Sequence, residues 1–142
     1  MKSFSYLLCG LLLLCGVNAS CAAADDKGCE DLLAALHKKP DYVEFLNCKQ
    51  RTDLQGSPIE AKYRVKGNRA ADAEDYLVKE FKIKKLGHTC CVWESADNSW
   101  RDERKRQFTI SMSTEDTKVD KREDWAKLDY FYIVLDLFRD DP

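Results

Sequence analysis

The sequence has little of what most catalytic and metal-binding sites require. Among its 142 residues are two histidines, His37 and His88, and they fall in separate segments. It contains no Cys-x-x-Cys pair, no His-x-x-x-His pair, no glycine-rich phosphate loop and no Gly-x-Ser-x-Gly elbow. These absences argue against a zinc site and a catalytic triad. We therefore predict a non-enzymatic protein with no metal, no cofactor and no catalytic residue.

Charge of one sign is not in excess either. The chain has 23 lysines and arginines against 25 aspartates and glutamates, a formal net charge of -2 at pH 7. Nucleic acids and acidic membrane surfaces attract proteins with a basic excess. We therefore predict no nucleic-acid partner, and contact with a membrane only through a lipid anchor at Cys21.

Long hydrophobic runs are missing except at the start of the chain. Lys2 is followed by an apolar run over residues 4–17 and then by small residues over 18–24. This is the pattern of a signal peptide, and a run of about 14 residues is too short to span a membrane comfortably. We predict a signal peptide over residues 1–24, cleaved between 19 and 24, and one domain over residues 25–142. The mature protein is then periplasmic or secreted.

The cysteine count bears on the cleavage site. Seven cysteines are present, and Cys9 and Cys15 leave with the signal peptide. Cleavage after Ala19 leaves an odd number of thiols, which is unfavourable in an oxidising compartment. Cleavage after Ala24 removes Cys21; alternatively, Cys21 becomes the lipidated first residue of a membrane-anchored lipoprotein. Soluble export is favoured because the lipoprotein pattern before Cys21 lacks its aliphatic residue.

Four cysteines remain as disulfide candidates: Cys29, Cys48, Cys90 and Cys91. We favour a Cys29–Cys48 disulfide, because the start of a helix and the end of the antiparallel strand after it lie close together. Cys90 and Cys91 are then neighbours, and adjacent strand residues point to opposite faces, so a ring between them requires a strained backbone. The crossed pairing, in which each bonds to Cys29 or Cys48, stays open.

Hydrophobic periodicity predicts the secondary structure. Apolar residues at helical spacing predict helices over residues 27–38 and 69–82. Short or alternating apolar segments predict five strands, over residues 42–48, 59–66, 89–94, 108–113 and 130–138. Residues 95–107 and 114–129 are predicted to be polar loops.

This order is α-β-β-α-β-β-β, an α+β fold. We predict a mostly antiparallel sheet with two helices on one face, stabilised by a disulfide. The strand, helix and strand between residues 59 and 94 suggest one parallel pair. The last strand is apolar on both faces and is predicted to be central.

Charged residues occur on two of the predicted strands. Glu60, Lys62, Arg64 and Lys66 are expected to face solvent. Asp136 lies on the second face of the apolar last strand, where burial would raise its pKa or require a cationic partner. We favour a solvated gap beside the sheet.

Tryptophan beside charge marks the candidate binding residues. Trp100 and Arg101 lie in one polar loop, and Arg122 and Trp125 in the next. Exposed tryptophan and arginine are typical of binding hot spots. The two loops would form one partner-binding patch if the last two strands are adjacent. For Trp100, a loop tryptophan folded back onto the domain is an equal alternative.

A resemblance rests on the spacing of several motifs. They are Cys29, Cys48, Tyr63-Arg64-Val65, Cys90-Cys91-Val92-Trp93-Glu94, Arg122-Glu123-Asp124-Trp125 and Tyr130-Phe131-Tyr132. With these motifs the chain resembles a family of small exported bacterial proteins known as a domain of unknown function, over nearly the whole mature chain. The resemblance implies export and a single domain, and it supplies no catalytic residues.

Together these observations predict an exported, non-enzymatic envelope protein. It would act as a protein-binding module, such as an inhibitor or immunity protein, with another envelope protein as its partner. The alternative is a periplasmic thiol-redox or hydrolytic enzyme that uses Cys90 and Cys91 or clustered carboxylates. The favoured interpretation of the two cysteines is a disulfide anchor beside a core tryptophan.

Overall fold

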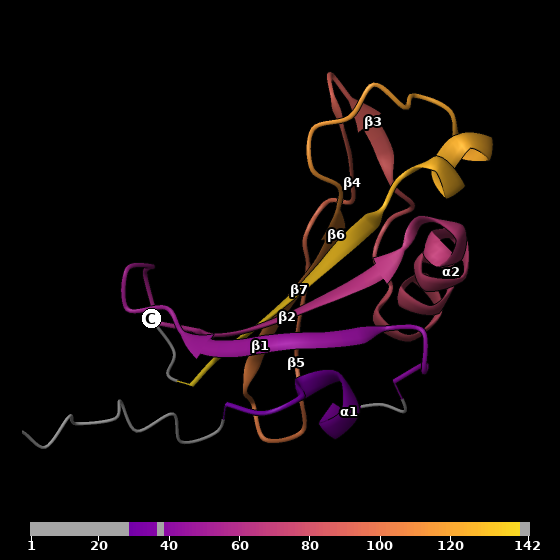
Figure 1. Ribbon diagram of the computed structural model, residues 1–142. Helices are drawn as coiled ribbons and strands as arrows, with labels where there is room; N and C mark the ends of the chain where they lie inside the picture. Colours follow the sequence, from indigo (N-terminus) through magenta and orange to yellow (C-terminus); the bar gives the residue numbers. More distant parts are fainter. Residues whose placement is uncertain (1–28, 37–38, 140–142) are drawn as a thin grey trace, which may run out of the picture.

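The computed structural model describes residues 29–36 and 39–139. The predicted signal peptide, Cys21 and His37 lie outside the described residues, and so do both ends of the helix predicted over 27–38. No helix in the described part of the chain is long and apolar enough to cross a membrane. The elements, shown in Figure 1, are α1 (Leu32–Leu36), β1 (Glu44–Gln50), β2 (Ile59–Lys66), the 3-10 helix η1 (Gly67–Arg69), α2 (Ala70–Phe81), β3 (Gly87–Thr89), β4 (Val92–Glu94), β5 (Asn98–Arg101), β6 (Gln107–Ser113), the 3-10 helix η2 (Arg122–Lys127) and β7 (Tyr130–Phe138).

These strands form one sheet of seven strands. Their order is β1-β2-β7-β6-β4-β3, and β5 pairs with β6 beside this path. β7 lies between β2 and β6, which confirms that the last strand is central. Every described strand pair is antiparallel. The predicted parallel pair is therefore wrong: the strand after α2 joins the far edge of the sheet and pairs with β4, not with β2.

Alternation along the strands separates a buried face from a partly exposed one. Ala61, Tyr63 and Val65 of β2 are at most 1% exposed. In the register of the sheet they lie opposite Leu135, Ile133 and Phe131 of β7, which are also buried. A β-strand directs successive side chains to opposite faces, so these facing residues of β2 and β7 form the central part of the core.

Each helix contacts residues of this core. The backbone N–H of Leu33 in α1 donates a hydrogen bond to the Tyr63 hydroxyl (2.9 Å). α2 buries Ala70, Ala73, Leu77 and Phe81 at helical spacing, as the apolar pattern predicts, and ends at Lys82 with left-handed φ. The helix predicted over residues 69–82 is therefore confirmed to within one residue at each end.

Two predicted segments differ from the structure in their strands, and turns are the reason; in addition, the polar loop predicted over 114–129 contains the 3-10 helix η2. The strand predicted over residues 89–94 is a hairpin, in which Thr89 pairs with Val92 and the chain reverses at Cys90 and Cys91. The polar loop predicted over 95–107 contains β5, whose Trp100 pairs with Phe108 of β6. The sheet thus has seven strands where the periodicity predicts five.

The N-terminal part of the domain is closed by the disulfide that the sequence favours. Cys29 and Cys48 are bonded, with their Cα atoms 5.4 Å apart. Cys29 precedes α1, and Cys48 lies within β1, which begins two residues later than predicted. Cys90 and Cys91 are free thiols at the opposite edge of the sheet. The crossed pairing is therefore not formed, and the interpretation of Cys90 and Cys91 as a disulfide anchor is wrong for this structure.

Candidate functional site

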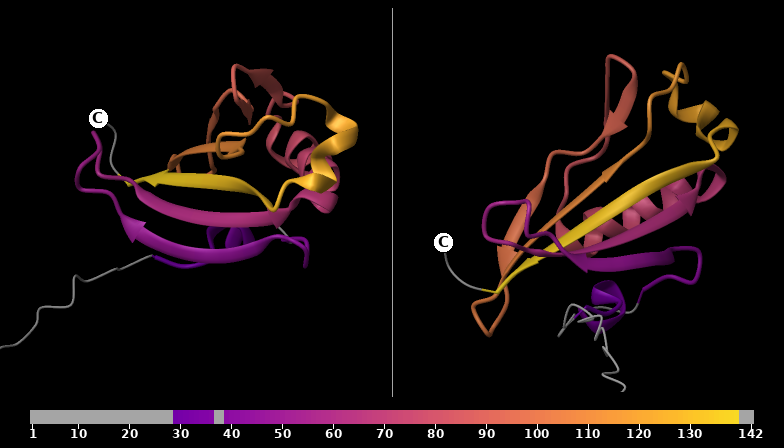
Figure 2. Two further views of the ribbon diagram at one scale, coloured as in Figure 1. Left: turned by 45° about the horizontal axis from the view of Figure 1, so that its top comes forward. Right: turned by 60° about the vertical axis from the view of Figure 1, so that its left-hand side comes forward.

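The face of the sheet opposite the buried row is the main candidate surface. We call it the open face; its outward-pointing residues on β2, β7 and β6 are Lys62, Arg64, Lys66, Tyr130, Tyr132, Val134, Asp136, Phe138, Thr109, Ser111 and Ser113. Each of them keeps part of its surface exposed. Figure 2 shows the strands curving across the molecule, so this row follows a bent surface.

Aromatic and basic side chains are interleaved on this face. The Arg64 guanidinium lies 4.4 Å from the centre of the Tyr130 ring and makes two hydrogen bonds to Glu44 of β1 (2.7 and 2.9 Å). These bonds raise the pKa of Arg64 and lower that of Glu44. Arg64 is opposite Tyr132 in the register. Arg64 on β2 thus contacts a carboxylate on β1 at one side and a tyrosine ring on β7 at the other.

Two carboxylates lie opposite each other within the same row. Glu60 of β2 pairs with Asp136 of β7, and Glu60 is only 5% exposed. The expectation that Glu60 faces solvent is therefore wrong, because Arg51 covers it and bonds one of its oxygens (2.6 Å). The same Arg51 makes two further hydrogen bonds to Asp53.

Burial changes the chemistry of Asp136. Burial first, and then the charge of Glu60, raises the pKa of Asp136 to about 6. Its Oδ1 is buried without a hydrogen-bond partner among the described residues, while Oδ2 accepts a weak bond from Thr109 (3.4 Å). Oδ1 is thus shielded from solvent although Asp136 keeps part of its surface exposed, so the expected solvated gap reaches only part of the side chain. Since only the register of β2 and β7 brings the two carboxylates together, no local signal in the sequence could have predicted this pair.

The structure separates the two halves of the predicted tryptophan patch, Trp100 with Arg101 and Trp125 with Arg122. Trp100 stacks on Phe108 (5.2 Å, 12° between the ring planes) and contacts Phe81 of α2. Trp125 is 3% exposed and packs on Trp93 and Phe131. Phe108 and Phe131 are at opposite ends of the β6–β7 ladder, so the two tryptophans do not share a patch even though the strands are adjacent.

Both arginines of that prediction have structural contacts. Arg122 is held by the buried carboxylate of Glu74 at 2.8 and 3.0 Å. Arg101 bonds the Lys105 carbonyl and the Gln107 side chain, which braces the turn between β5 and β6. Trp100 corresponds to the alternative in which the loop tryptophan folds back onto the domain. The two pairs anchor the fold at two separate places.

The turn between β3 and β4 carries the remaining candidate residues. Cys90 is exposed and Cys91 is partly buried. The hydrogen bond to Cys90, followed by burial and the nearby charge of Asp116, raises the pKa of Cys91 to about 11. A thiol with a raised pKa has little thiolate at neutral pH, and the thiolate is the nucleophile. This turn is therefore a poor site for a catalytic cysteine.

Fold and surface define a class: an antiparallel α+β protein that buries one sheet face and leaves the other partly exposed, with charge and aromatic rings mixed on it. By sequence, the chain belongs to DUF4952, a family described as a domain of unknown function, whose model matches residues 18–93. The match ends at Trp93, so it does not include Arg122-Trp125 and Tyr130-Tyr132. Neither the curated proteins nor the solved structures contain a match to this chain.

Proposed function

We propose that this protein is an exported, non-enzymatic binding module that uses the open face to bind another protein of the envelope. One observation carries the proposal: a row of tyrosine, arginine and hydroxyl side chains lies partly exposed on the central strands. We infer that α1 and α2 cover the opposite face, because α1 contacts Tyr63 and α2 contacts Trp100, both of which lie on the buried side.

The composition of the open face fits a protein partner. Tyrosine and arginine are enriched at protein interfaces, and serine adds adaptable hydrogen bonding at little entropic cost. Tyr130 and Tyr132 lie on a central strand, where the backbone is rigid and binding costs less ordering entropy. An inhibitor or immunity protein needs such a surface and no catalytic group.

Charge indicates the chemistry of the partner. Lys66 of β2 is exposed and has no ion pair within the described residues, and the same holds for Lys49 on β1, beside Glu60 in the register. We infer a partner with acidic side chains opposite these two lysines, which lie toward opposite ends of β2 in the register, and apolar or aromatic side chains opposite β7. Complementary charge of this kind raises the association rate more than the affinity.

Export also belongs to this proposal. The Cys29–Cys48 disulfide is typical of oxidising compartments, and the N-terminal sequence has the pattern of a signal peptide. Lipidation at Cys21 would tether the same module to a membrane without changing its fold. The enzymatic alternative has weaker support, because the pKa of Cys91 is raised and the Glu60–Asp136 pair belongs to a sheet face.

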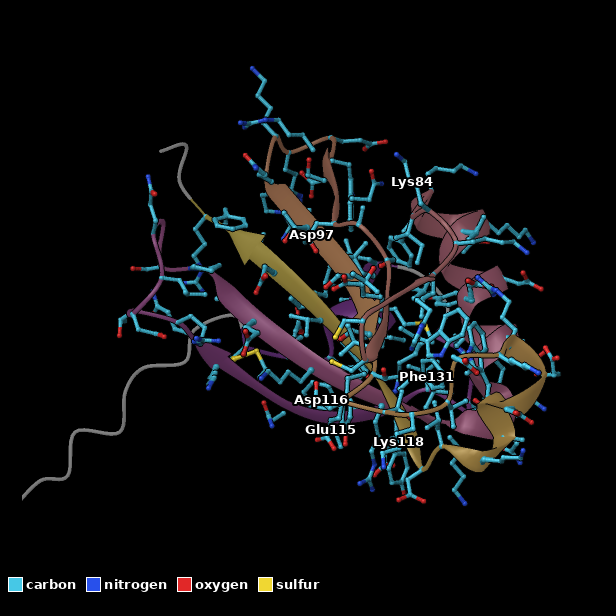
Figure 3. All side chains as sticks on the ribbon, turned by 90° about the horizontal axis from the view of Figure 1, so that it is seen from above. Lys84, Asp97, Glu115, Asp116, Lys118 and Phe131 are labelled. Carbon is cyan, nitrogen blue, oxygen red and sulfur yellow. A yellow bond between two sulfur atoms is a disulfide. The ribbon has the colours of Figure 1, made fainter. Side chains whose placement is uncertain are left out.

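The experiment begins with crosslinking in intact cells to identify a partner, which is then purified and titrated against this protein. We expect a 1:1 complex. Tyr132→Ala should raise its Kd at least tenfold, and Lys66→Glu should slow association several-fold at low salt. Lys84→Glu is the matched control, because Lys84 is an exposed lysine on the segment after α2 (Figure 3).

Each variant is first shown by its amide NMR spectrum to be folded. The proposal is overturned if the purified complex keeps its Kd in both open-face variants, or if Lys84→Glu weakens it as much as they do. Failure to recover any stoichiometric protein partner would also overturn it.

A further inference from the structure

We propose that Cys90 and Cys91 form a reversible vicinal disulfide in the turn of the β3–β4 hairpin, through thiol–disulfide exchange with a small-molecule disulfide of the glutathione type. This site is separate from the open face and does not rest on the protein-binding proposal. Four observations on the hairpin support it.

The first observation is the position of the two cysteines. Thr89 pairs with Val92, so Cys90 and Cys91 are the two residues of a tight turn. In a regular strand, neighbouring side chains point to opposite faces. At a turn this restriction is lifted, so the side chains of these two consecutive residues need not point to opposite faces.

The second observation is the backbone of Cys90. Its φ is 53°, in the left-handed region. Cys90 is the first of the two central residues of the turn. When this residue has a positive φ, it is ordinarily glycine, because other residues are strained in that conformation. Such strain is concentrated at functional sites, and a dithiol gives a cysteine at this position a role that glycine could not fill.

The third observation is that the turn is held from outside the hairpin. The backbone N–H of Thr117 donates to the Cys91 carbonyl (2.6 Å), and the Cys91 thiol lies 3.8 Å from Asp116 Oδ1. The backbone N–H of Thr114 donates to the Trp93 carbonyl (2.8 Å). Figure 3 shows Asp116 on the segment that follows β6. These contacts fix the position of Cys91 and of β4 against the segment that follows β6.

The fourth observation is isolation from the other cysteines. Cys29 and Cys48 are bonded to each other at the β1 edge of the sheet, and the hairpin forms the opposite edge. Among the described residues, the only intramolecular partner for each hairpin thiol is its neighbour. Neighbouring Cα atoms lie about 3.8 Å apart, below the usual range for a disulfide, so the ring is strained and more easily reduced.

The exchange takes place in two steps. One hairpin thiol loses its proton and its sulfur attacks the disulfide of oxidised glutathione; an S–S bond forms to the protein, and one glutathione leaves as a thiolate. The second hairpin thiol loses its proton and attacks the protein-bound sulfur, which releases the second glutathione. The protein loses two electrons and two protons, and the products are two reduced glutathione molecules and one vicinal disulfide.

The test uses the folded protein with its Cys29–Cys48 disulfide intact, equilibrated in glutathione buffers of stepwise ratio. Samples are quenched in acid, alkylated and digested, and the peptide with residues 90–91 is weighed. We expect this peptide to lose two hydrogens and to escape alkylation in oxidising buffers. The equilibrium constant for forming the Cys90–Cys91 disulfide from the two thiols and oxidised glutathione should be at least tenfold lower than the constant for forming Cys29–Cys48.

Cys90→Ser and Cys91→Ser are matched controls, because each removes one sulfur and keeps the size of the side chain. Each should retain one glutathione on its remaining hairpin cysteine, since no neighbouring thiol can release it. Alkylation of both cysteines of the original protein at every ratio would overturn the proposal. Stable glutathione adducts on both, or a disulfide-linked dimer through them, would overturn it as well.

Discussion

Arg122 and Glu74, 48 residues apart in the sequence, form a two-bonded ion pair that joins η2 to α2. Glu74 also accepts a hydrogen bond from the backbone N–H of Leu86 (2.6 Å), and Arg122 donates to the carbonyl of the same residue. The guanidinium lies 4.6 Å from the centre of the Trp125 ring. One carboxylate and one guanidinium therefore tie three segments together.

Removing Arg122 should destabilise the protein strongly. The side chain of Glu74 is 3% exposed, so Arg122→Ala leaves a buried carboxylate without its cation, at a cost of about 3–5 kcal/mol. Arg64→Ala is the control: its partner Glu44 has a side chain that is 55% exposed, and such surface pairs contribute at most about 1 kcal/mol. Urea unfolding of the two variants measures the difference, and equal costs would contradict this account of the pair.

A methyl group at Gly67 should also be poorly tolerated. A Cβ at this position would lie 2.2 Å from the carbonyl oxygens of Trp125 and Leu128, where η1 meets η2. Gly67→Ala should therefore cost about 3 kcal/mol through overpacking. Gly87→Ala is the matched control, because a Cβ there has no neighbour within 4 Å. Thermal unfolding should separate the two variants clearly; similar melting temperatures would refute the predicted clash.

Asp136 should make stability fall as pH rises. Its pKa is raised to about 6 in the folded protein, against 3.8 as the ordinary value, so between these values the folded state holds more protons than the unfolded state. Stability is then lost as pH rises from about 4 to about 6 and regained on acidification. Because the group is partly exposed, we expect an effect of about 1 kcal/mol rather than the full value of the shift.

Asp136→Asn removes this titration. The variant should be more stable than the original protein at neutral pH, by about 1 kcal/mol, and the two should converge near pH 4. Urea titrations at several pH values measure the difference. Glu115→Gln, which removes an exposed carboxylate that does not act on Asp136, controls for the change in net charge. A difference between Asp136→Asn and the original protein that is the same at every pH would disprove the assignment.

Trp100 should matter for stability and not for binding. Its ring is held between Phe81 and Phe108, so Trp100→Ala should cost about 2–3 kcal/mol. Trp100→Phe keeps an aromatic ring in the stack and should recover much of this. Once folded, both variants should bind the partner of the open face with unchanged affinity. A selective loss of binding with normal stability would restore Trp100 as a hot spot.

Several elements could be predicted from the sequence alone. β2 and β7 have the predicted bounds, Ile59–Lys66 and Tyr130–Phe138, and α2 differs by one residue at each end. In each of these elements the hydrophobic residues repeat at a regular spacing over enough residues to identify a strand or a helix from that segment alone. β3 and β4 have three residues each, too few to show a period, and the turn between them contains cysteines where turn residues such as glycine or asparagine would have given a signal.

By itself, the sequence determined the identity of the long elements, the order in which they follow one another and the centrality of the last strand, because periodicity and apolar content are local properties. The tertiary structure alone decided which side chains meet. The register of β2 and β7 places Glu60 opposite Asp136, and the packing of η2 on α2 places Arg122 on Glu74. Such contacts join residues far apart in the chain, and they depend on strand register and helix packing, which no short segment encodes.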